Sequence, residues 1–104
     1  ELEGRHRQLA AAADALARTA RTDPLTGLLN RRALDDLAAE QAGRPFAGAV
    51  AVLDMNDLKP INDRLGHAAG DAALQSVARA LRNLFRITDP LFRTGGDEFL
   101  VVLV

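Results

Sequence analysis

The chain of 104 residues contains no cysteine, no tryptophan and no tyrosine, and its four aromatic residues are all phenylalanine. Without cysteine it has neither a disulfide framework nor a thiolate metal site. With a net charge of −1 it also lacks the basic surface and the stacking rings of a general nucleic-acid-binding protein. No apolar run approaches the roughly 18 residues that span a bilayer, and no signal peptide is visible. We therefore expect a cytoplasmic protein, with no nucleic-acid partner and no membrane contact in this segment.

The residues that are present suffice for one small domain. The chain is 48% hydrophobic and 26% charged, which allows a modest core. It opens at Glu1 without a methionine and stops at Val104 inside an apolar run. Both ends suggest an excised piece of a longer protein, with any sensor domain, and any membrane tether, upstream of Glu1.

Residues 1–22 are predicted to form one helix, in which Leu2, Leu9 and Leu16 recur every seven residues. This repeat is typical of the seam of a coiled coil, which would join two copies of the chain. A lone amphipathic helix packed on its own domain explains the same pattern, and the sequence leaves both possibilities open. The proline after Asp23 ends the helix, because the residue before a proline avoids helical angles.

Residues 23–104 are predicted to form a separate α+β domain. The order helix, strand, helix, helix, strand, strand favours helices packed on a mostly antiparallel sheet. The expected elements are a turn at Gly27, a helix with Asn30 as N-cap, a loop at 42–46, a buried central strand at 48–54, a helix from about Pro60 to a C-cap at Gly66, a helix that opens at Asp71, and a hairpin at 90–104. In the hairpin turn, Gly95 and Gly96 are expected to supply the positive φ of a tight turn.

Three carboxylates are expected to meet at one edge of this sheet. Asp54 ends the first strand, while Asp97 and Glu98 lie at the tip of the hairpin that pairs beside it. Such a cluster repels itself unless a cation neutralises it. Without cysteine or a nearby histidine, the cation would be a hard, oxygen-liking ion such as Mg²⁺, which usually also holds phosphate. Alternatively, Asp54 caps the following turn and the hairpin acids are solvated; the acids alone do not decide.

The residues between the first strand and the long helix suggest a nucleotide. Lys59 offers a point charge to a polyphosphate, and backbone N–H groups around Asp57 and Leu58 could cradle phosphate oxygens. The Asp71 carboxylate can accept from the N1 and N2 donors of guanine, and the Asn62 amide can bind elsewhere on the base. Adenine has no such donor pair. Taken singly, Asn62 is also explained as a solvated helix residue and Asp71 as an N-cap.

Four motifs in order, DPLTGLLNRR, DMNDLKPIND, GHAAGD and RTGGDEF, resemble the GGDEF-domain family, the diguanylate cyclases. The resemblance runs from about Asp23 to Val104. It implies a fold like the palm of nucleotide polymerases, dependence on Mg²⁺ or Mn²⁺, and condensation of two GTP molecules into cyclic di-GMP, with one GTP on each domain of a homodimer. A complete family domain continues well past the hairpin. We therefore expect a palm-like fold that is incomplete at the C-terminus, and little or no product from this piece alone.

The resemblance also implies roles for individual residues. The implied metal ligands are Asp54, Asp97 and the Met55 carbonyl. Glu98 would act in metal binding or proton transfer. Asn62 and Asp71 match guanine-reading positions, Lys59 matches a phosphate contact, Gly95 and Gly96 would let the turn approach the nucleotide, and Arg86 with Asp89 matches the RxxD pair of the product-inhibition site. Asn56 stands where many members have a second aspartate.

The pair Arg86 and Asp89 has two explanations from its chemistry alone. An exposed i,i+3 ion pair at a helix end would contribute less than about 1 kcal/mol. Alternatively, the Arg86 guanidinium fits guanine O6 and N7 with two parallel hydrogen bonds, and Asp89 accepts from a guanine donor edge. Two further functions also stay open for the whole chain: a module that binds GTP or cyclic di-GMP without turnover, and a fragment whose helix serves only for dimerisation.

Overall fold

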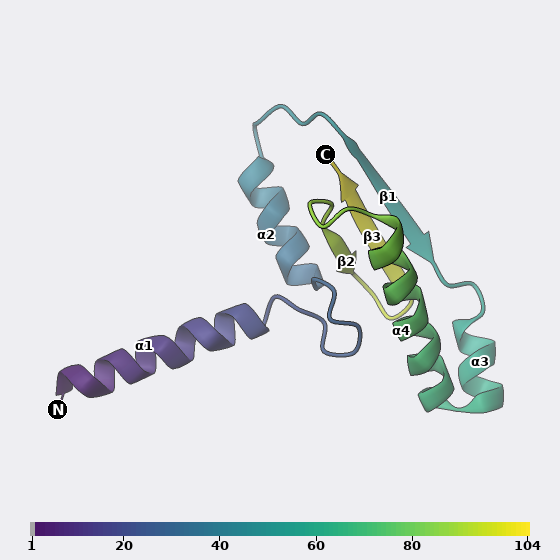
Figure 1. Cartoon of the computed structure of the whole chain (residues 1–104), viewed down its shortest axis with the longest axis horizontal. Coiled ribbons are helices and arrows are strands. Elements are labelled where there is room, and N and C mark those ends of the chain that lie inside the picture. Colours follow the sequence, from purple (N-terminus) through teal and green to yellow (C-terminus); the bar gives the residue numbers. More distant parts are fainter. Residues whose placement is uncertain (1) are drawn as a thin grey trace.

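The computed structural model describes residues 2–104, with the side chains of residues 4–13 and 20–104. Its elements are α1 (Leu2–Thr19), α2 (Arg31–Gln41), β1 (Ala49–Asp54), α3 (Leu58–Leu65), α4 (His67–Leu84), β2 (Leu91–Arg93) and β3 (Glu98–Leu103) (Figure 1). All strand pairs are antiparallel. The prediction of an α+β fold with helices on a mostly antiparallel sheet is therefore confirmed.

The sheet has the strand order β1-β3-β2, so the last strand of the chain is the central one. The prediction that the first strand is buried and central is wrong. Within the described residues β1 pairs with β3 alone, and Val50 and Val52 are 55% and 59% exposed. A continuous apolar run indicates a strand suited to burial on both faces, but the described helices cover the hairpin and leave most of β1 uncovered.

Two apolar clusters cover opposite faces of the β2–β3 hairpin. On one face, α4 contributes Leu74, Ala78 and Leu81, which recur on one side of the helix and pack with Phe99 of β3. The other face carries a cluster of Ala33 from α2, Phe92 and Val102. Side chains along a strand alternate between the two faces of the sheet, which is why Phe99 and Val102 belong to different clusters. The core thus fixes the hairpin between α2 and α4.

Local signals place the start of α2 and the end of α3 correctly, whereas α1 ends at Thr19 and not at residue 22, and α3 begins at Leu58 and not at Pro60. The Asn30 side chain accepts a hydrogen bond from the Ala33 N–H at 2.9 Å, as expected of an N-cap. Gly66, with φ of 90°, ends α3 as predicted. However, α4 begins at His67, one turn before the predicted start. Asp71 is therefore an exposed residue in the second turn and not an N-cap, because Gly66 ends one helix and begins the next with no loop between them.

The hairpin turn, which we define as residues 94–97, does not use its glycines as predicted. Among the described residues only Gly27, Gly43 and Gly66 have a positive φ, so Gly95 and Gly96 do not. The paired residues on either side of the connection are Arg93 and Phe99. A connection of this length can reverse the chain without the left-handed residues that a two-residue turn needs.

Helix α1 projects away from the rest of the chain (Figure 1). Its seam residue Leu9 is 68% exposed, so this leucine is not packed on the domain. Leu2 and Leu16, the other members of the leucine repeat, lie outside the described side chains. The coiled coil therefore stays a prediction. In the described part of the chain, no helix has the combination of length and apolar composition required to cross a membrane.

Candidate functional site

The end of β1 and the start of β3 lie side by side, as the sequence predicted. Asp54 is the cross-strand partner of Glu98, so their side chains project from the same face of the sheet. The next residue, Met55, donates its N–H to the Asp97 carbonyl at 3.0 Å. Asp54 and Asp97 are both exposed, and Glu98 is half-buried. The register of β1 on β3 thus gathers the predicted metal-binding residues at one edge.

The three carboxylates do not form a compact cluster. No group of three or more acidic or histidine side chains within the described residues is close enough to hold a metal. The Glu98 carboxylate is engaged within the chain, since its Oε1 accepts from the Thr94 hydroxyl at 2.7 Å. Mg²⁺ commonly takes one or two carboxylates and keeps several waters. Asp54, Asp97 and a backbone carbonyl are therefore a donor set that fits this ion.

Asn62 on α3 lies where this helix packs against α4, next to Gly70, and Asp71 follows Gly70 on α4. The Asn62 Oδ1 atom is buried and has no hydrogen-bond partner. Gly70, the residue before Asp71, makes room for it, because a Cβ at position 70 would lie 1.7 Å from that oxygen. A buried acceptor without a partner costs about 1–3 kcal/mol. Asp71, the next residue along α4, is exposed, so its carboxylate is open to solvent.

The first turn of α3 carries the predicted phosphate contacts. Lys59 is exposed, and Asp57 occupies the N-cap position without a capping hydrogen bond from its side chain. The N–H groups that begin this helix, near Leu58, are therefore not capped by Asp57. Such N–H groups, with the positive end of the helix dipole, attract anions. Only residues 55–57 separate this turn from Asp54 at the end of β1.

Arg86 and Asp89 form a turn and not an ion pair. The Asp89 carboxylate accepts from the Arg86 backbone N–H at 3.0 Å, and the Asp89 N–H donates to the Arg86 carbonyl at 2.9 Å. The Arg86 guanidinium makes no hydrogen bond within the described residues and is exposed. Both residues line a pocket of about 460 Å³ together with Gly27, Leu28, Leu29, Arg82, Phe85, Ile87, Pro90 and Leu91. Sequence reasoning missed the wall that residues 27–29 provide.

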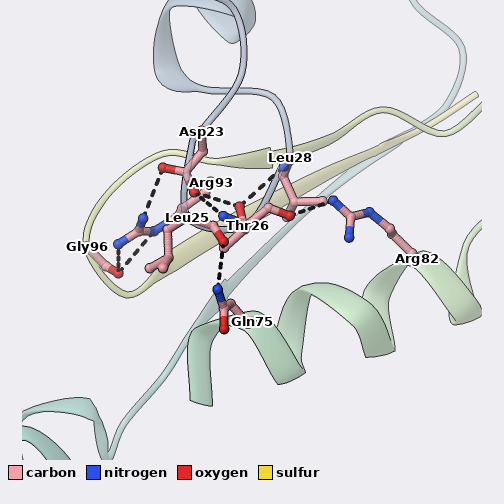
Figure 2. A network of polar contacts seen from close by, with 8 residues as sticks. All are labelled: Asp23, Leu25, Thr26, Leu28, Gln75, Arg82, Arg93 and Gly96. Carbon is pink, nitrogen blue, oxygen red and sulfur yellow. Dashed lines mark hydrogen bonds and ion pairs between the residues drawn. The ribbon is translucent and has the colours of Figure 1, made fainter. Parts of the chain in front are cut away.

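A polar network beneath the hairpin turn was also missed (Figure 2). Asp23 accepts from the Thr26 N–H at 2.8 Å and from its hydroxyl at 2.7 Å. Its other oxygen pairs with Arg93 at 3.0 Å, and these two side chains are only 15% and 17% exposed. Burial raises the pKa of the Asp23 carboxyl, but the hydrogen bonds from Thr26 and the charge of Arg93 outweigh it and hold this pKa below its usual 3.8.

The turn at residues 23–28 is held against α4 as well. Gln75 donates to the Leu25 carbonyl at 3.2 Å, and Arg82 donates to the Thr26 carbonyl. Gly27 is favoured here because its φ is 74°, a conformation that other side chains rarely adopt. A Cβ would also lie 2.8 Å from the end of the flexible Arg82 side chain, which would have to shift. Aspartate is a preferred residue for accepting from a backbone N–H three positions later, as an N-cap does, so the sequence did carry a signal for the local part of this network.

Known proteins resemble most of this chain. A family model described as "Diguanylate cyclase, GGDEF domain" matches residues 20–104. Diguanylate cyclase DgcP of Pseudomonas aeruginosa is 49% identical over 86 residues, which cover 79% of this chain and 13% of that protein. Cyclic di-GMP phosphodiesterase PdeB of Shewanella oneidensis is 43% identical over 88 residues, which cover 85% of this chain and 10% of that protein.

The fold is similar to that of solved structures. The coiled coil and GGDEF domain of DgcB from Caulobacter crescentus, in complex with c-di-GMP, matches with a TM-score of 0.84 and 30% identity, over 97% of this chain and 55% of that chain. This chain therefore spans about half of that solved chain and only 13% and 10% of the two curated relatives.

Proposed function

We propose, since this chain belongs to the GGDEF-domain family of diguanylate cyclases, that the protein in which it occurs condenses two GTP molecules into cyclic di-GMP and releases pyrophosphate. The family inferred from the four motifs is the one that the family model identifies. The observation that carries the proposal is the register that places Asp54 opposite Glu98 and ties Met55 to Asp97. It gathers exposed carboxylates at the end of β1, just before the first turn of α3 in the chain, and a metal-bound triphosphate would need both.

Asp54, Asp97 and the Met55 carbonyl would hold Mg²⁺ or Mn²⁺. When bound, this ion would lower the pKa of the attacking 3′-hydroxyl and neutralise charge on the phosphate that is transferred. Lys59 and the N–H groups near Asp57 and Leu58 would hold the triphosphate. Glu98, which Thr94 orients, would assist the metal or accept the proton of the hydroxyl.

Guanine would be read at the junction of α3 and α4. Asp71 would accept from the N1 and N2 donors of the base, and the Asn62 amide would bind elsewhere on the base. Because the described fold requires glycine at neither position 95 nor 96, by φ or by packing, we propose that these residues leave room for the nucleotide. One GTP on each of two facing domains would then react, with the helix of residues 1–22 as the linker that pairs them.

The pocket at Arg86 and Asp89 would bind the product. The free Arg86 guanidinium can form two hydrogen bonds with guanine O6 and N7, and the apolar wall beside it would contact the base. Cyclic di-GMP carries two guanines, so one product molecule could bridge two domains and keep their active sites apart.

A second function is favoured by one relative. PdeB, 43% identical to this chain, is named a cyclic di-GMP phosphodiesterase. A domain of this family therefore also occurs in a protein with the opposite activity. In the alternative, this domain would bind GTP or cyclic di-GMP without turnover and regulate a neighbouring domain.

The two functions are separated by one assay. The full-length gene product is incubated with GTP and Mg²⁺, and cyclic di-GMP and pyrophosphate are quantified, with a parallel reaction that contains EDTA. The cyclase proposal predicts magnesium-dependent formation of both products. Tight binding of GTP without either product would contradict it and select the binding module.

A further inference from the structure

Arg93 connects two segments that are far apart in the sequence (Figure 2). Its Nη1 donates to Asp23 at 3.0 Å, while its Nε and Nη2 donate to the Gly96 carbonyl at 3.3 and 2.9 Å. One guanidinium therefore links the turn after α1 to the hairpin turn. Only a planar group with several donors can make both sets of contacts at once.

The contacts of Arg93 act on the backbone beside Asp97. Because the peptide group is planar and trans, fixing the Gly96 carbonyl also fixes the direction of the Asp97 N–H. On the other side, the Asp97 carbonyl accepts from the Met55 N–H at 3.0 Å. Both peptide groups of Asp97 are thus held, and this exposed residue keeps freedom mainly in its side-chain torsions.

Asp23 is well suited to hold Arg93 in place. One carboxylate oxygen takes two hydrogen bonds from Thr26, which fixes the carboxylate, and the other meets the guanidinium. The pair is nearly buried, whereas the Arg21–Asp36 pair nearby is 46% exposed on both sides. Exposed pairs are screened by water and contribute little, so Asp23–Arg93 is the ion pair here that can maintain a fixed geometry.

We propose that Arg93 is a positioning residue, which sets the peptide between Gly96 and Asp97 and depends on Asp23 for its own placement. Asp23 belongs to the connection that follows α1. The backbone conformation of the hairpin turn therefore depends on the position of this connection. That Asp97 then binds a metal rests on the proposed function, but the contacts that hold the turn do not.

The first test measures amide hydrogen exchange in the full-length gene product without nucleotide. Two amides report on the turn: Thr94 N–H donates to the Glu98 carbonyl, and Met55 N–H donates to the Asp97 carbonyl. Arg93→Lys keeps a positive charge beside Asp23 but loses the guanidinium N–H groups that donate to the Gly96 carbonyl. We expect exchange at these two amides to rise about tenfold in Arg93→Lys, and by a smaller factor in Asp23→Asn.

Gln75→Ala is the matched control, because Gln75 anchors the turn at residues 23–28 to α4 and does not contact the hairpin turn. It should leave exchange at Thr94 and Met55 at the parent rate. Unchanged exchange at both amides in Arg93→Lys would overturn the proposal. So would an increase that extends evenly over the chain, α4 included, because the ion pair would then only stabilise the fold.

The second test measures cyclic di-GMP formation against Mg²⁺ concentration. Arg93→Lys should lower kcat and raise the Mg²⁺ concentration for half-maximal rate about tenfold, with little change in KM for GTP. Gln75→Ala should match the parent. A loss in KM alone would contradict a role in placing Asp97. If the parent makes no product while the exchange results hold, the proposed function fails and the positioning role of Arg93 stands.

Discussion

Two aspartates beside the same hairpin are used in opposite ways. Asp23 is nearly buried, and both of its carboxylate oxygens accept hydrogen bonds, from Thr26 and from Arg93. Asp97 is exposed in the turn that Arg93 holds, and no hydrogen bond to its carboxylate occurs within the described residues. A carboxylate satisfied by its own protein contributes to stability, whereas one left unsatisfied on a fixed backbone is available to a cation.

The largest effects are expected when each of these two carboxylates is removed by substitution. Asp97→Ala should lower the cyclase rate of the full-length protein by a factor of at least about 10²–10³, through loss of a metal ligand, with no change in the midpoint of thermal unfolding. Asp23→Ala is the counterpart and should reduce the free energy of unfolding by about 3 kcal/mol, because it leaves Arg93 uncompensated. Near-normal activity in Asp97→Ala would show that this residue does not hold the metal.

A second substitution tests whether Gly96 in the hairpin turn lacks a side chain because a ligand occupies that space. A Cβ on Gly96 would meet no atom of the described fold within 4 Å, and the φ of this residue is not positive. Gly96→Ala should therefore unfold at the parent temperature but bind GTP about tenfold or more weakly, because the methyl group occupies the nucleotide's place. Calorimetric titration with GTP and Mg²⁺ measures this loss, and equal affinity in variant and parent would refute the assignment.

The residues proposed to bind guanine are expected to show an effect of similar size that is selective for the base. Asp71→Ala should weaken GTP binding by about 1–3 kcal/mol, which is a factor of roughly 5–150, since it removes the acceptor for the N1 and N2 donors. Binding of ATP should not change, because adenine has no such pair. Competition binding with both nucleotides is the measurement, and an equal loss for ATP and GTP would exclude a base-reading role for Asp71.

The depressed pKa of Asp23 predicts a smaller effect on stability at acid pH. Because the folded pKa is lower than the unfolded one, the unfolded chain binds more protons between the two values. This contribution to stability is complete above about pH 4 and is lost as the pH falls through the folded pKa. Asp23→Asn cannot titrate, so the difference in melting temperature between parent and variant should shrink from pH 5 to pH 3. A constant difference would contradict the assignment.

The smallest expected effect on the initial rate is that of Arg86→Ala. Its guanidinium belongs to the proposed product pocket and not to the acidic edge of the sheet. Initial rates should stay within about twofold of the parent, while product should accumulate beyond the concentration at which the parent stalls. If both proteins stall at the same concentration of cyclic di-GMP, Arg86 has no part in product inhibition.

Much of the fold was predictable because its signals are local. Asn30 caps its helix through a residue three positions away, and Gly66 ends α3 through its own φ. The order of the elements, and the acids at the ends of β1 and β3, follow from short apolar runs and the polar residues that bound them. The motifs that identify the family are local patterns of the same kind, so the candidate site could be named from the sequence.

Only the tertiary structure decided which residues meet across long stretches of chain. The Asp23–Arg93 pair joins residues 70 positions apart, and neither residue signals the other in the sequence. The edge position of β1 depends on which strands pair, and the need for glycine at position 70 depends on how α3 packs against α4. Local propensity acts within a turn or two of chain, whereas these contacts depend on how the completed elements pack. The sequence by itself therefore determined the helices, the strands and the polar residues at their ends, and packing determined which of those residues hold the site in place.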